Sequence, residues 1–260
     1  MSGPRIMIDG VPVPDGEAVR VLLDDGLVRG DGVFEGMRQY GRSIRTARAH
    51  LDRMERSCAA ISLPFDRATI AEELHRFSAL TSEADCAIRL MLTRGGQRIL
   101  REEPLPPHAD SWRLLPVEHR ISPLLMESKT LSYAANMQAN RLAKAAGFDE
   151  ALMVRAGDRV VLEAPTSSFL WIEGDDVVFP PLSLGILDSL TRRLVVEAVP
   201  VRERELPVEG LAGADGALLV STVLESRPIR AVGEVAIPTD GARLAEVRRA
   251  LSEITLARLG

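Results

Sequence analysis

The spacing of apolar residues along the first half of the chain predicts strands alternating with helices. From Thr46 to Ile61 apolar side chains recur at helical intervals, and a second amphipathic helix follows Asp66, a residue suited to cap a helix start. Arg5 to Val13 has the pattern of a short hairpin. Ala87 to Thr93 and Trp112 to Val117 are mainly apolar runs of strand length. This half therefore predicts one α/β unit.

The stretch from Leu27 to Met37, LVRGDGVFEGM, mixes glycines with apolar residues. Gly30, Gly32 and Gly36 would let backbone come close to another group. A dinucleotide fingerprint is not favoured, because no GxGxxG opens a helix here. The pattern predicts a bulged strand.

The second half begins with an Ala-rich helical segment that ends at Gly147, a residue suited to the left-handed conformation that closes helices. Strands over Glu150 to Arg155 and Arg159 to Glu163 follow, and a turn between them predicts a hairpin. The later apolar patterns predict a hairpin over 169–179, a helix capped by Asp188 or Ser189, a strand over 216–222 and a closing helix around 244–254.

The length of 260 residues allows one large domain or two smaller ones. Three prolines between Arg101 and Pro107 end the first unit, and Glu118 to Pro123 has the character of a crossing segment. We therefore expect an N-terminal domain over residues 1–117, a linker over 118–123 and a C-terminal domain over 124–260.

Composition excludes several classes of function. Hydrophobic residues make up 46% and charged residues 27%, which is typical of a soluble globular protein. A net charge of -5 with scattered basic residues argues against nucleic acid as a partner. No apolar run is long enough to span a membrane, and the N-terminus has no signal-peptide core, so a cytoplasmic location is expected. Cys58 and Cys86 have no metal-ligand spacing, and neither a disulfide framework nor a metal site is expected.

One lysine has a setting that suggests chemistry. Lys129 precedes the Ala-rich helix, and the predicted hairpin would allow Lys129 and Glu163 to reach one cavity. A lysine that forms a Schiff base and an acid that keeps a ring nitrogen protonated are the two groups that a pyridoxal phosphate enzyme needs.

Taken together, the segments resemble the class IV aminotransferases, the fold-type IV pyridoxal phosphate enzymes. The family includes D-amino acid aminotransferases, branched-chain aminotransferases and aminodeoxychorismate lyases. The resemblance covers nearly the whole chain and follows the order of the motifs GDGVFEGMRQY, HLDRM, SKTLSY, VVLEAPTSSF, ILDSLTR and STVLESRP. It implies an α/β (α+β) chain with a small N-terminal α/β domain and a larger C-terminal domain that binds pyridoxal 5'-phosphate on a mixed, barrel-like β core. It also implies a homodimer.

The resemblance assigns roles to single residues of this sequence. Lys129 is similar to the catalytic Schiff-base lysine, and Glu163 to the partner of the pyridine nitrogen. Tyr133 is expected to hydrogen-bond the phenolic oxygen of the cofactor, as a tyrosine does in some relatives. The remaining cofactor contacts implied by the resemblance are Arg53, Leu190, Thr191, Ser221 and Thr222 at the phosphate and Leu187 against the ring.

The substrate side departs from the family's usual pattern. Phe34 stands where D-amino acid aminotransferases have a tyrosine that helps to hold the substrate carboxylate, and Leu100 replaces a histidine companion of the loop arginine, which Arg98 matches. Ser168 replaces a usual asparagine. Our hypothesis is that Arg89 and an Arg29 from the same or a second subunit bind the carboxylate instead.

The leading functional hypothesis is transamination between an amino acid and a 2-oxo acid. GDGVFE and ILDSLTR favour D-amino acids such as D-alanine or D-glutamate, with pyruvate or 2-oxoglutarate as acceptor. FEGMR is also similar to the branched-chain L-amino acid aminotransferases, and an aminodeoxychorismate lyase would use the same lysine for elimination. A non-catalytic protein that binds a phosphorylated ligand is a further alternative, because fold does not establish activity.

Overall fold

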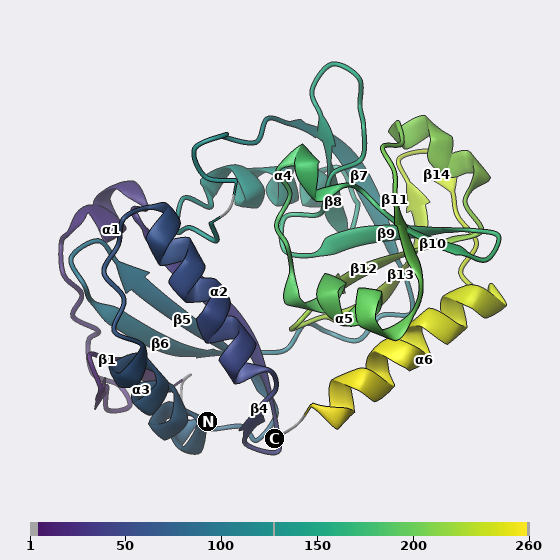
Figure 1. Ribbon diagram of the computed structural model, residues 1–260. Coiled ribbons are helices and arrows are strands. Elements are labelled where there is room, and N and C mark those ends of the chain that lie inside the picture. Colours follow the sequence, from purple (N-terminus) through teal and green to yellow (C-terminus); the bar gives the residue numbers. More distant parts are fainter. Residues whose placement is uncertain (1–4, 127, 259–260) are drawn as a thin grey trace. The chain divides into compact units, whose positions relative to one another are not determined.

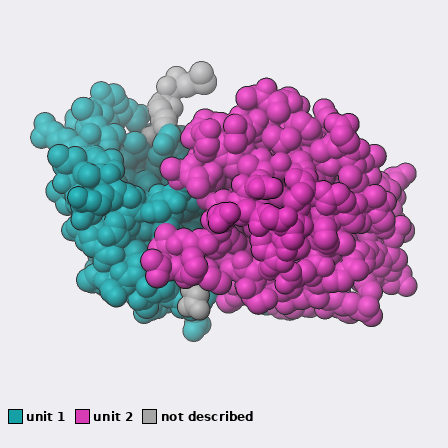
Figure 2. Space-filling view, turned by 90° about the horizontal axis from the view of Figure 1, so that it is seen from above, with its two compact units in different colours: residues 1–106, 127–133, 258–260 teal, residues 107–126, 134–257 magenta. Residues whose placement is uncertain are grey.

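The protein was analysed as a computed structural model that describes residues 5–126 and 128–258 (Figure 1). The chain forms two compact units, which Figure 2 colours separately. Unit 1 lies within Met1–Pro106, Glu127–Tyr133 and Arg258–Gly260, and unit 2 consists of Pro107–Met126 and Ala134–Ala257.

These units differ from the expected domains 1–117 and 124–260 at residues 107–117, at Lys129 to Tyr133 and at Arg258, which falls in unit 1. Residues 107–117 fall in unit 2, because their strand pairs with two strands of that unit. Lys129 to Tyr133 fall in unit 1, because Thr130 forms a bridge with Val33 of that unit. Lys129 therefore belongs to the first unit, although its position in the sequence suggested the second.

Unit 1 contains a six-stranded antiparallel sheet with the order β2-β1-β6-β5-β3-β4. The predicted hairpin over Arg5 to Val13 is confirmed by the pairing of β1 with β2, and the predicted strand over Ala87 to Thr93 is β5. The strands are β1 (Ile6–Ile8), β2 (Val11–Pro12), β3 (Gly32–Tyr40), β4 (Ser43–Ile44), β5 (Cys86–Thr93) and β6 (Arg98–Glu103).

Two predicted helices, α2 (Ala47–Ala60) and α3 (Arg67–Leu80), cover one face of this sheet (Figure 1). Asp66 caps α3 as predicted, because its carboxylate accepts a hydrogen bond from Thr69 N at 3.2 Å. Side chains of α2, α3 and the strands form one apolar core, which includes Met54, Phe77, Ile88 and Leu90.

Strand alternation divides β3 between the two faces of the sheet. Val33 and Met37 belong to the helix-covered core, so Glu35 between them points to the same face. Phe34, Gly36 and Arg38 point to the other face, which we call the open face. Their register partners on β5, Met91, Arg89 and Ala87, lie on the open face too.

The prediction of a bulged strand over Leu27 to Met37 was wrong. Helix α1 (Asp25–Arg29) begins after Asp24, whose side chain accepts a hydrogen bond from Leu27 N, and Gly30 ends it at φ +71°. Strand β3 then runs without a bulge in its pairing with β5. The close approach expected at a glycine does occur, because a Cβ on Gly32 would lie 2.4 Å from Leu92 O.

Unit 2 contains an eight-stranded mixed sheet in which β14 pairs with β13, off the main order β11-β10-β9-β12-β13-β7-β8. Parallel pairing joins β10 to β11, β13 to β7 and β7 to β8, and the other pairs are antiparallel. The strands are β7 (Trp112–His119), β8 (Glu150–Arg155), β9 (Ser168–Glu173), β10 (Asp176–Phe179), β11 (Val201–Glu203), β12 (Gly216–Ser221), β13 (Glu225–Val232) and β14 (Val235–Ala236).

The helices of unit 2 include the predicted Ala-rich helix and the closing helix. Helices α5 and α6 pack with β9 and β12 in one apolar cluster, while Phe169 and Trp171 belong to a second cluster. The elements are α4 (Ala134–Ala145), α5 (Leu190–Ala198), α6 (Ala242–Ala257) and the short 3-10 helices η1 (Leu182–Leu184) and η2 (Val208–Gly213). None of the helices within the described residues could span a lipid bilayer.

The predicted second strand over Arg159 to Glu163 does not form a regular ladder. Val161 forms an isolated bridge with Val154 and Val160 forms one with Pro207, while the carbonyl of Val160 accepts from Arg155 N of β8 at 2.8 Å. Arg159 has a positive φ of 57°, so the chain turns just before this segment and pairs on both sides. The expected proximity to β8 still holds, because Met153 N donates to Glu163 O at 2.9 Å.

The turn that follows Glu163 is anchored by a buried carboxyl group. Glu150 at the start of β8 is 4% exposed and accepts a hydrogen bond from Thr166 Oγ1 at 3.0 Å. Asn136 on α4 donates to Pro165 O at 3.2 Å. Burial raises the pKa of Glu150 to about 7, so near neutrality this group holds a proton that an exposed glutamate has lost.

We predict that Glu150→Gln changes the pH dependence of stability. Between pH 4.5 and 7 the native protein binds a proton at Glu150 that the unfolded chain has released, so the contribution of Glu150 to stability decreases as pH rises through this interval. The total loss is about 3 kcal/mol. The free energy of unfolding in urea of the Gln variant, relative to the wild type, should therefore be about 3 kcal/mol higher at pH 8 than at pH 4.

The exposed Glu55→Gln provides a control for removal of a carboxyl group, because the contact of Glu55 with Arg67 is a surface ion pair that contributes little to stability. If the difference in the free energy of unfolding between wild type and Glu150→Gln is equal at pH 4 and pH 8, the raised pKa of Glu150 is contradicted.

Candidate active site

The backbone of Lys129 is fixed against β3 and α2. Phe34 N donates to Lys129 O at 3.0 Å, and Lys129 N donates to Ser57 Oγ at 3.0 Å. The bridge between Thr130 and Val33 extends this contact by one residue. The lysine thus has a defined position at the end of a sheet and beside a helix.

The ring of Phe34 is the centre of a group of predicted site residues on the open face. The amine of Lys129 lies 4.4 Å from the ring centroid, and the guanidinium carbon of Arg89 lies 4.9 Å from it. The Tyr133 ring meets Phe34 edge to face, with 5.2 Å between centroids. The structure therefore brings together predicted site residues from three distant stretches of the sequence, namely Phe34, Arg89 and the pair Lys129 and Tyr133.

Beneath β3, on the helix-covered face, Glu35, His50 and Arg53 form a buried charge cluster. Arg53 donates to both carboxylate oxygens of Glu35, from Nε at 2.7 Å and from Nη2 at 2.6 Å. His50 Nδ1 lies 2.8 Å from Glu35 Oε2. Glu35 and His50 are fully buried and Arg53 is 7% exposed.

The charge state of the cluster follows from its contacts. Burial raises the pKa of Glu35, but the positive charge of Arg53 and the hydrogen bonds from Arg53 and His50 outweigh it and hold this pKa well below its ordinary value. Burial lowers the pKa of His50, so the ring is neutral and Nδ1 donates to Glu35. Within the described residues, the buried His50 Nε2 has no hydrogen-bond partner.

The predicted phosphate ligand Arg53 thus has a partner that the sequence interpretation did not include. Its Nε and Nη2 groups serve Glu35, which leaves the Nη1 group to meet an anion. Arg53 lies one helical turn before Ser57, the residue that holds the backbone of Lys129. Lys129 therefore contacts α2 one helical turn after Arg53.

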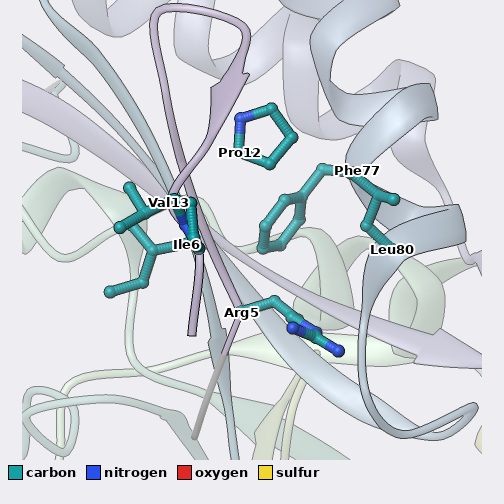
Figure 3. Close-up of a pocket in the computed structure, with 7 residues that line it drawn as sticks. Arg5, Ile6, Pro12, Val13, Phe77 and Leu80 are labelled. Carbon is teal, nitrogen blue, oxygen red and sulfur yellow. The ribbon is translucent and has the colours of Figure 1, made fainter. Parts of the chain in front are cut away.

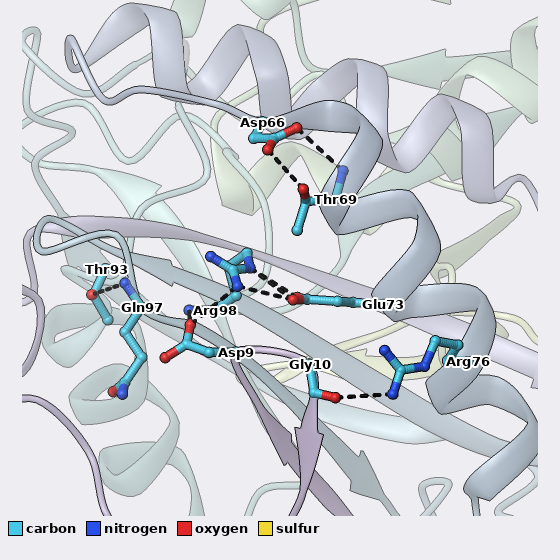
Figure 4. A network of polar contacts seen from close by, with 9 residues as sticks. All are labelled: Asp9, Gly10, Asp66, Thr69, Glu73, Arg76, Thr93, Gln97 and Arg98. Atoms are coloured by element: carbon cyan, nitrogen blue, oxygen red, sulfur yellow. Dashed lines mark hydrogen bonds and ion pairs between the residues drawn. The ribbon is translucent and has the colours of Figure 1, made fainter.

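Arg98, the predicted loop arginine of the carboxylate trap, is not brought to this group. It pairs with Leu92, a core residue, so it points to the helix-covered face rather than the open face. Its guanidinium donates to Glu73 at 2.9 and 3.0 Å and lies 3.5 Å from Asp9 (Figure 4). These contacts join β6 to α3 and to the β1–β2 turn.

Arg29 is also separate from the group around Phe34. It is an exposed residue in the last turn of α1, and its guanidinium forms an ion pair with Asp25 of the same helix. A role for Arg29 beside Arg89 would therefore require a second copy of the chain, which is one of the two sources that the hypothesis allowed.

A pocket of about 300 Å³ lies elsewhere in unit 1, between the β1–β2 hairpin and α3 (Figure 3). Its lining includes Ile6, Val13, Phe77 and Leu80. The charged residue of the lining, Arg5, forms an ion pair with Asp15 at 2.6 Å. The pocket contains none of the predicted site residues.

In unit 2, Glu163 is joined to the segment that precedes α5. Leu187 N donates to Glu163 Oε1 at 3.1 Å, so the residue expected beside a cofactor ring and the acid expected at its nitrogen are neighbours. The backbone of Glu163 is held by Met153 at the same time. The carboxylate thus projects from a fixed segment.

The predicted anion-binding residues of unit 2 lie near one end of the neighbouring strands β9 and β12. Ser189 caps α5, because its hydroxyl accepts from Arg192 N at 3.1 Å, and the first backbone N–H groups of the helix, at Leu190 and Thr191, remain for an anion. Ser168 donates to Ser189 Oγ at 2.8 Å and pairs with Val220 across the sheet.

Because Ser221 and Thr222 follow Val220 directly, they lie at the same end of β9 and β12 as Ser168 and the start of α5. The serine that replaces the family's asparagine, Ser168, therefore supports the helix cap.

Four residues of these sites were missed by the sequence interpretation: Glu35, His50, Ser57 and Glu103, which pairs with Arg89 at 2.8 Å. A signal existed on α2, where His50, Arg53 and Ser57 recur at helical spacing beside the apolar residues Leu51, Met54 and Cys58. A polar row that borders a buried face points to buried polar partners.

Comparison with known proteins agrees with this geometry. A model of the family described as Amino-transferase class IV matches residues 32–232. The chain is 28% identical over 250 residues to a Methanocaldococcus jannaschii protein named as a branched-chain-amino-acid aminotransferase, with 86% of each chain covered. It is 27% identical to a D-alanine aminotransferase of Staphylococcus epidermidis, covering 86% of this chain and 88% of the relative. An aminodeoxychorismate lyase of Bacillus subtilis is 24% identical, with 88% and 87% covered.

The fold is also that of solved class IV structures. A hypothetical aminotransferase from Mycobacterium tuberculosis in its PLP-bound form superimposes with a TM-score of 0.87 at 22% identity, over 97% of this chain and 99% of that one. The family match covers more than half of the chain. The chain therefore belongs to the class IV aminotransferases, a family of enzymes that depend on pyridoxal phosphate.

Proposed function

We propose that this protein is a pyridoxal phosphate-dependent transaminase that exchanges an amino group between an amino acid and a 2-oxo acid, with D-amino acids such as D-alanine or D-glutamate as the favoured donors. The observation that carries the proposal is the position of Lys129. Its amine lies beside Phe34 and its backbone is held by Phe34 and Ser57, while Arg89 lies against the same ring.

The residues fit the cofactor in each unit. In unit 1, Lys129 would bond to the aldehyde carbon, Tyr133 would meet the phenolic oxygen and Arg53 Nη1 would meet the phosphate. In unit 2, Glu163 would hold the proton on the ring nitrogen, Leu187 would lie against the ring, and the start of α5 with Ser221 and Thr222 would bind a phosphate. When bound, the ring supplies an electron sink that acidifies the substrate carbon.

Lys129 Nζ is then the group that takes a proton from the substrate carbon and returns it. The guanidinium of Arg89 lies against the same Phe34 ring as this amine.

We propose that Arg89 binds the substrate carboxylate. Its position on the open face beside Phe34 supports this role, because a substrate that reacts at Lys129 would meet it. Gly36 is the register partner of Arg89, and a Cβ at Gly36 would meet nothing within 4 Å. This leaves room for a ligand next to the guanidinium. Arg98 is not included, because it points to the other face.

We also infer a homodimer, in which Arg29 of one copy serves the site of the other. Large apolar residues are exposed along one stretch of unit 1, including Leu23 at 83%, Leu27 at 57% and Val28 at 57%. This stretch is held firmly, because Asp24 accepts from Thr93 Oγ1 at 2.5 Å and from Gly95 N at 2.6 Å. An ordered apolar surface next to Arg29 suits a second copy.

Sedimentation velocity tests this inference. The wild type is expected to be a dimer, and Leu23→Asp should shift it toward the monomer because a charge in an apolar interface remains unpaired. Val11→Asp is the matched control, since Val11 is exposed at 66% on β2 and should leave the dimer intact. A monomeric wild type would remove the inference.

The alternative of a branched-chain L-amino acid aminotransferase is supported by the FEGMR run and by a relative of equal similarity. The lyase alternative is supported by the Bacillus subtilis relative. All three activities would use Lys129, so the cofactor residues do not distinguish them.

A substrate panel distinguishes the three activities. We expect the holoenzyme to convert pyruvate or 2-oxoglutarate with D-alanine or D-glutamate as donor, and to be slower with L-leucine and aminodeoxychorismate. Arg89→Gln should raise KM for these acids about 10- to 100-fold, because a charged hydrogen bond is lost. Turnover of L-leucine or aminodeoxychorismate without turnover of D-amino acids would replace the favoured donor class.

A further inference from the structure

A substrate carboxylate that approaches Arg89 also meets the negative charge of Glu103. Glu103, at the end of β6, accepts from Arg89 Nε at 2.8 Å and from Arg89 Nη2 at 3.1 Å. Strand register explains the contact, because Ala87 pairs with Glu103 and Arg89 lies two residues further along β5 on the same face. The proposed carboxylate-binding group therefore already holds a carboxylate of its own chain.

The distances put this ion pair within reach of a substrate. The Lys129 amine and the Arg89 guanidinium lie 4.4 and 4.9 Å from the same Phe34 centroid, so their separation cannot exceed the sum of these distances. In an α-amino acid the nitrogen and the carboxyl carbon are about 2.5 Å apart, and the nitrogen can lie about 3 Å from the lysine amine. A guanidinium–carboxylate hydrogen bond adds about 3 Å. A substrate that reaches Lys129 can thus also reach Arg89.

The geometry of the pair leaves one edge of the guanidinium for a ligand. Glu103 contacts Nε and Nη2, so Nη1 is on the remaining edge, and a Cβ on Gly36, the register partner of Arg89, would meet nothing within 4 Å. A carboxylate bound at that edge would lie about 7 Å from the carboxylate of Glu103 across one guanidinium. Both residues of the pair are partly exposed, at 35% for Arg89 and 26% for Glu103, so water screens this repulsion only in part.

We propose that Glu103 determines specificity by opposing the binding of a substrate carboxylate to Arg89. The negative charge of Glu103 repels the incoming carboxylate and lowers the affinity of the site for acids. When no substrate is bound, Glu103 holds the guanidinium of Arg89 in place. This inference rests on the proposed role of Arg89. The repulsion at this distance corresponds to about a tenfold difference in affinity.

Glu103→Gln tests the inference, because glutamine keeps an oxygen for Arg89 and removes the charge. The probes are propionate, a carboxylate that has no amino or keto group, and its uncharged analogue propionamide. Their dissociation constants are measured on the holoenzyme by competition with the 2-oxo acid and by calorimetry. We expect propionate to bind about tenfold more tightly to the variant and propionamide to bind equally to both proteins.

Three further results belong to the same experiment. KM for pyruvate should fall by a similar factor in Glu103→Gln while kcat is maintained. The gain should shrink in 1 M salt, where the screening length is about 3 Å. It should also disappear in the double variant Arg89→Gln/Glu103→Gln, since the two charges act through one site. Glu55→Gln, which removes one surface charge on the helix-covered side, should change none of these values.

The inference is overturned if Glu103→Gln binds propionate equally well or more weakly than wild type, the latter being the result expected of a residue that only orients Arg89. It is also overturned if propionamide gains as much as propionate. A holoenzyme that transaminates no amino acid would refute the proposed function, while the propionate and propionamide measurements would still decide the role of Glu103.

Discussion

The backbone pairing of Lys129 with β3 is the interaction on which the rest of the candidate site depends. One hydrogen bond from Phe34 N and one to Ser57 Oγ hold the lysine between a strand and a helix. The pairing brings the Lys129 amine, Phe34, Tyr133 and Arg89 to one face of the unit 1 sheet. It also explains why Lys129 to Tyr133 belong to unit 1, although the longer stretches that precede and follow this segment in the sequence belong to unit 2. A chemical group on a flexible loop would have no such fixed geometry.

Opposite charges are paired on both faces of this sheet, with different consequences. On the helix-covered face Arg53 and Glu35 are buried, so loss of either partner would leave an uncompensated charge and cost about 3 to 5 kcal/mol. On the open face Arg89 and Glu103 are partly exposed, and the pair contributes little to stability. In the proposed roles, the buried pair orients Arg53 for the cofactor phosphate, whereas the partly exposed pair adjusts how strongly Arg89 attracts a substrate carboxylate.

The sequence pattern predicted those parts of the fold that depend on interactions between residues close together in the sequence. The periodicity of α2, the cap at Asp66 and the cap at Ser189 depend on residues within a few positions of one another, and all three are present. Helix α1 was missed because its start depends on Asp24, whose side chain is fixed by Thr93 and Gly95 far along the chain. The pairing of Lys129 with Phe34 is equally non-local. The direction of Arg98 could have been predicted from the sequence. Arg98 lies two residues before the buried Leu100 on the same strand, so both side chains point to the helix-covered face.

The assignment of Lys129 as the residue that bonds to the cofactor is the central claim, and the chain has only one other lysine, Lys144. Borohydride reduction of the holoenzyme followed by peptide mapping tests it directly, because reduction makes the bond between a lysine and pyridoxal phosphate permanent. The account predicts the added pyridoxyl mass on the peptide that contains Lys129, with none in Lys129→Ala and an unchanged yield in Lys144→Ala. The added mass on Lys144, or an unchanged yield in Lys129→Ala, would contradict it.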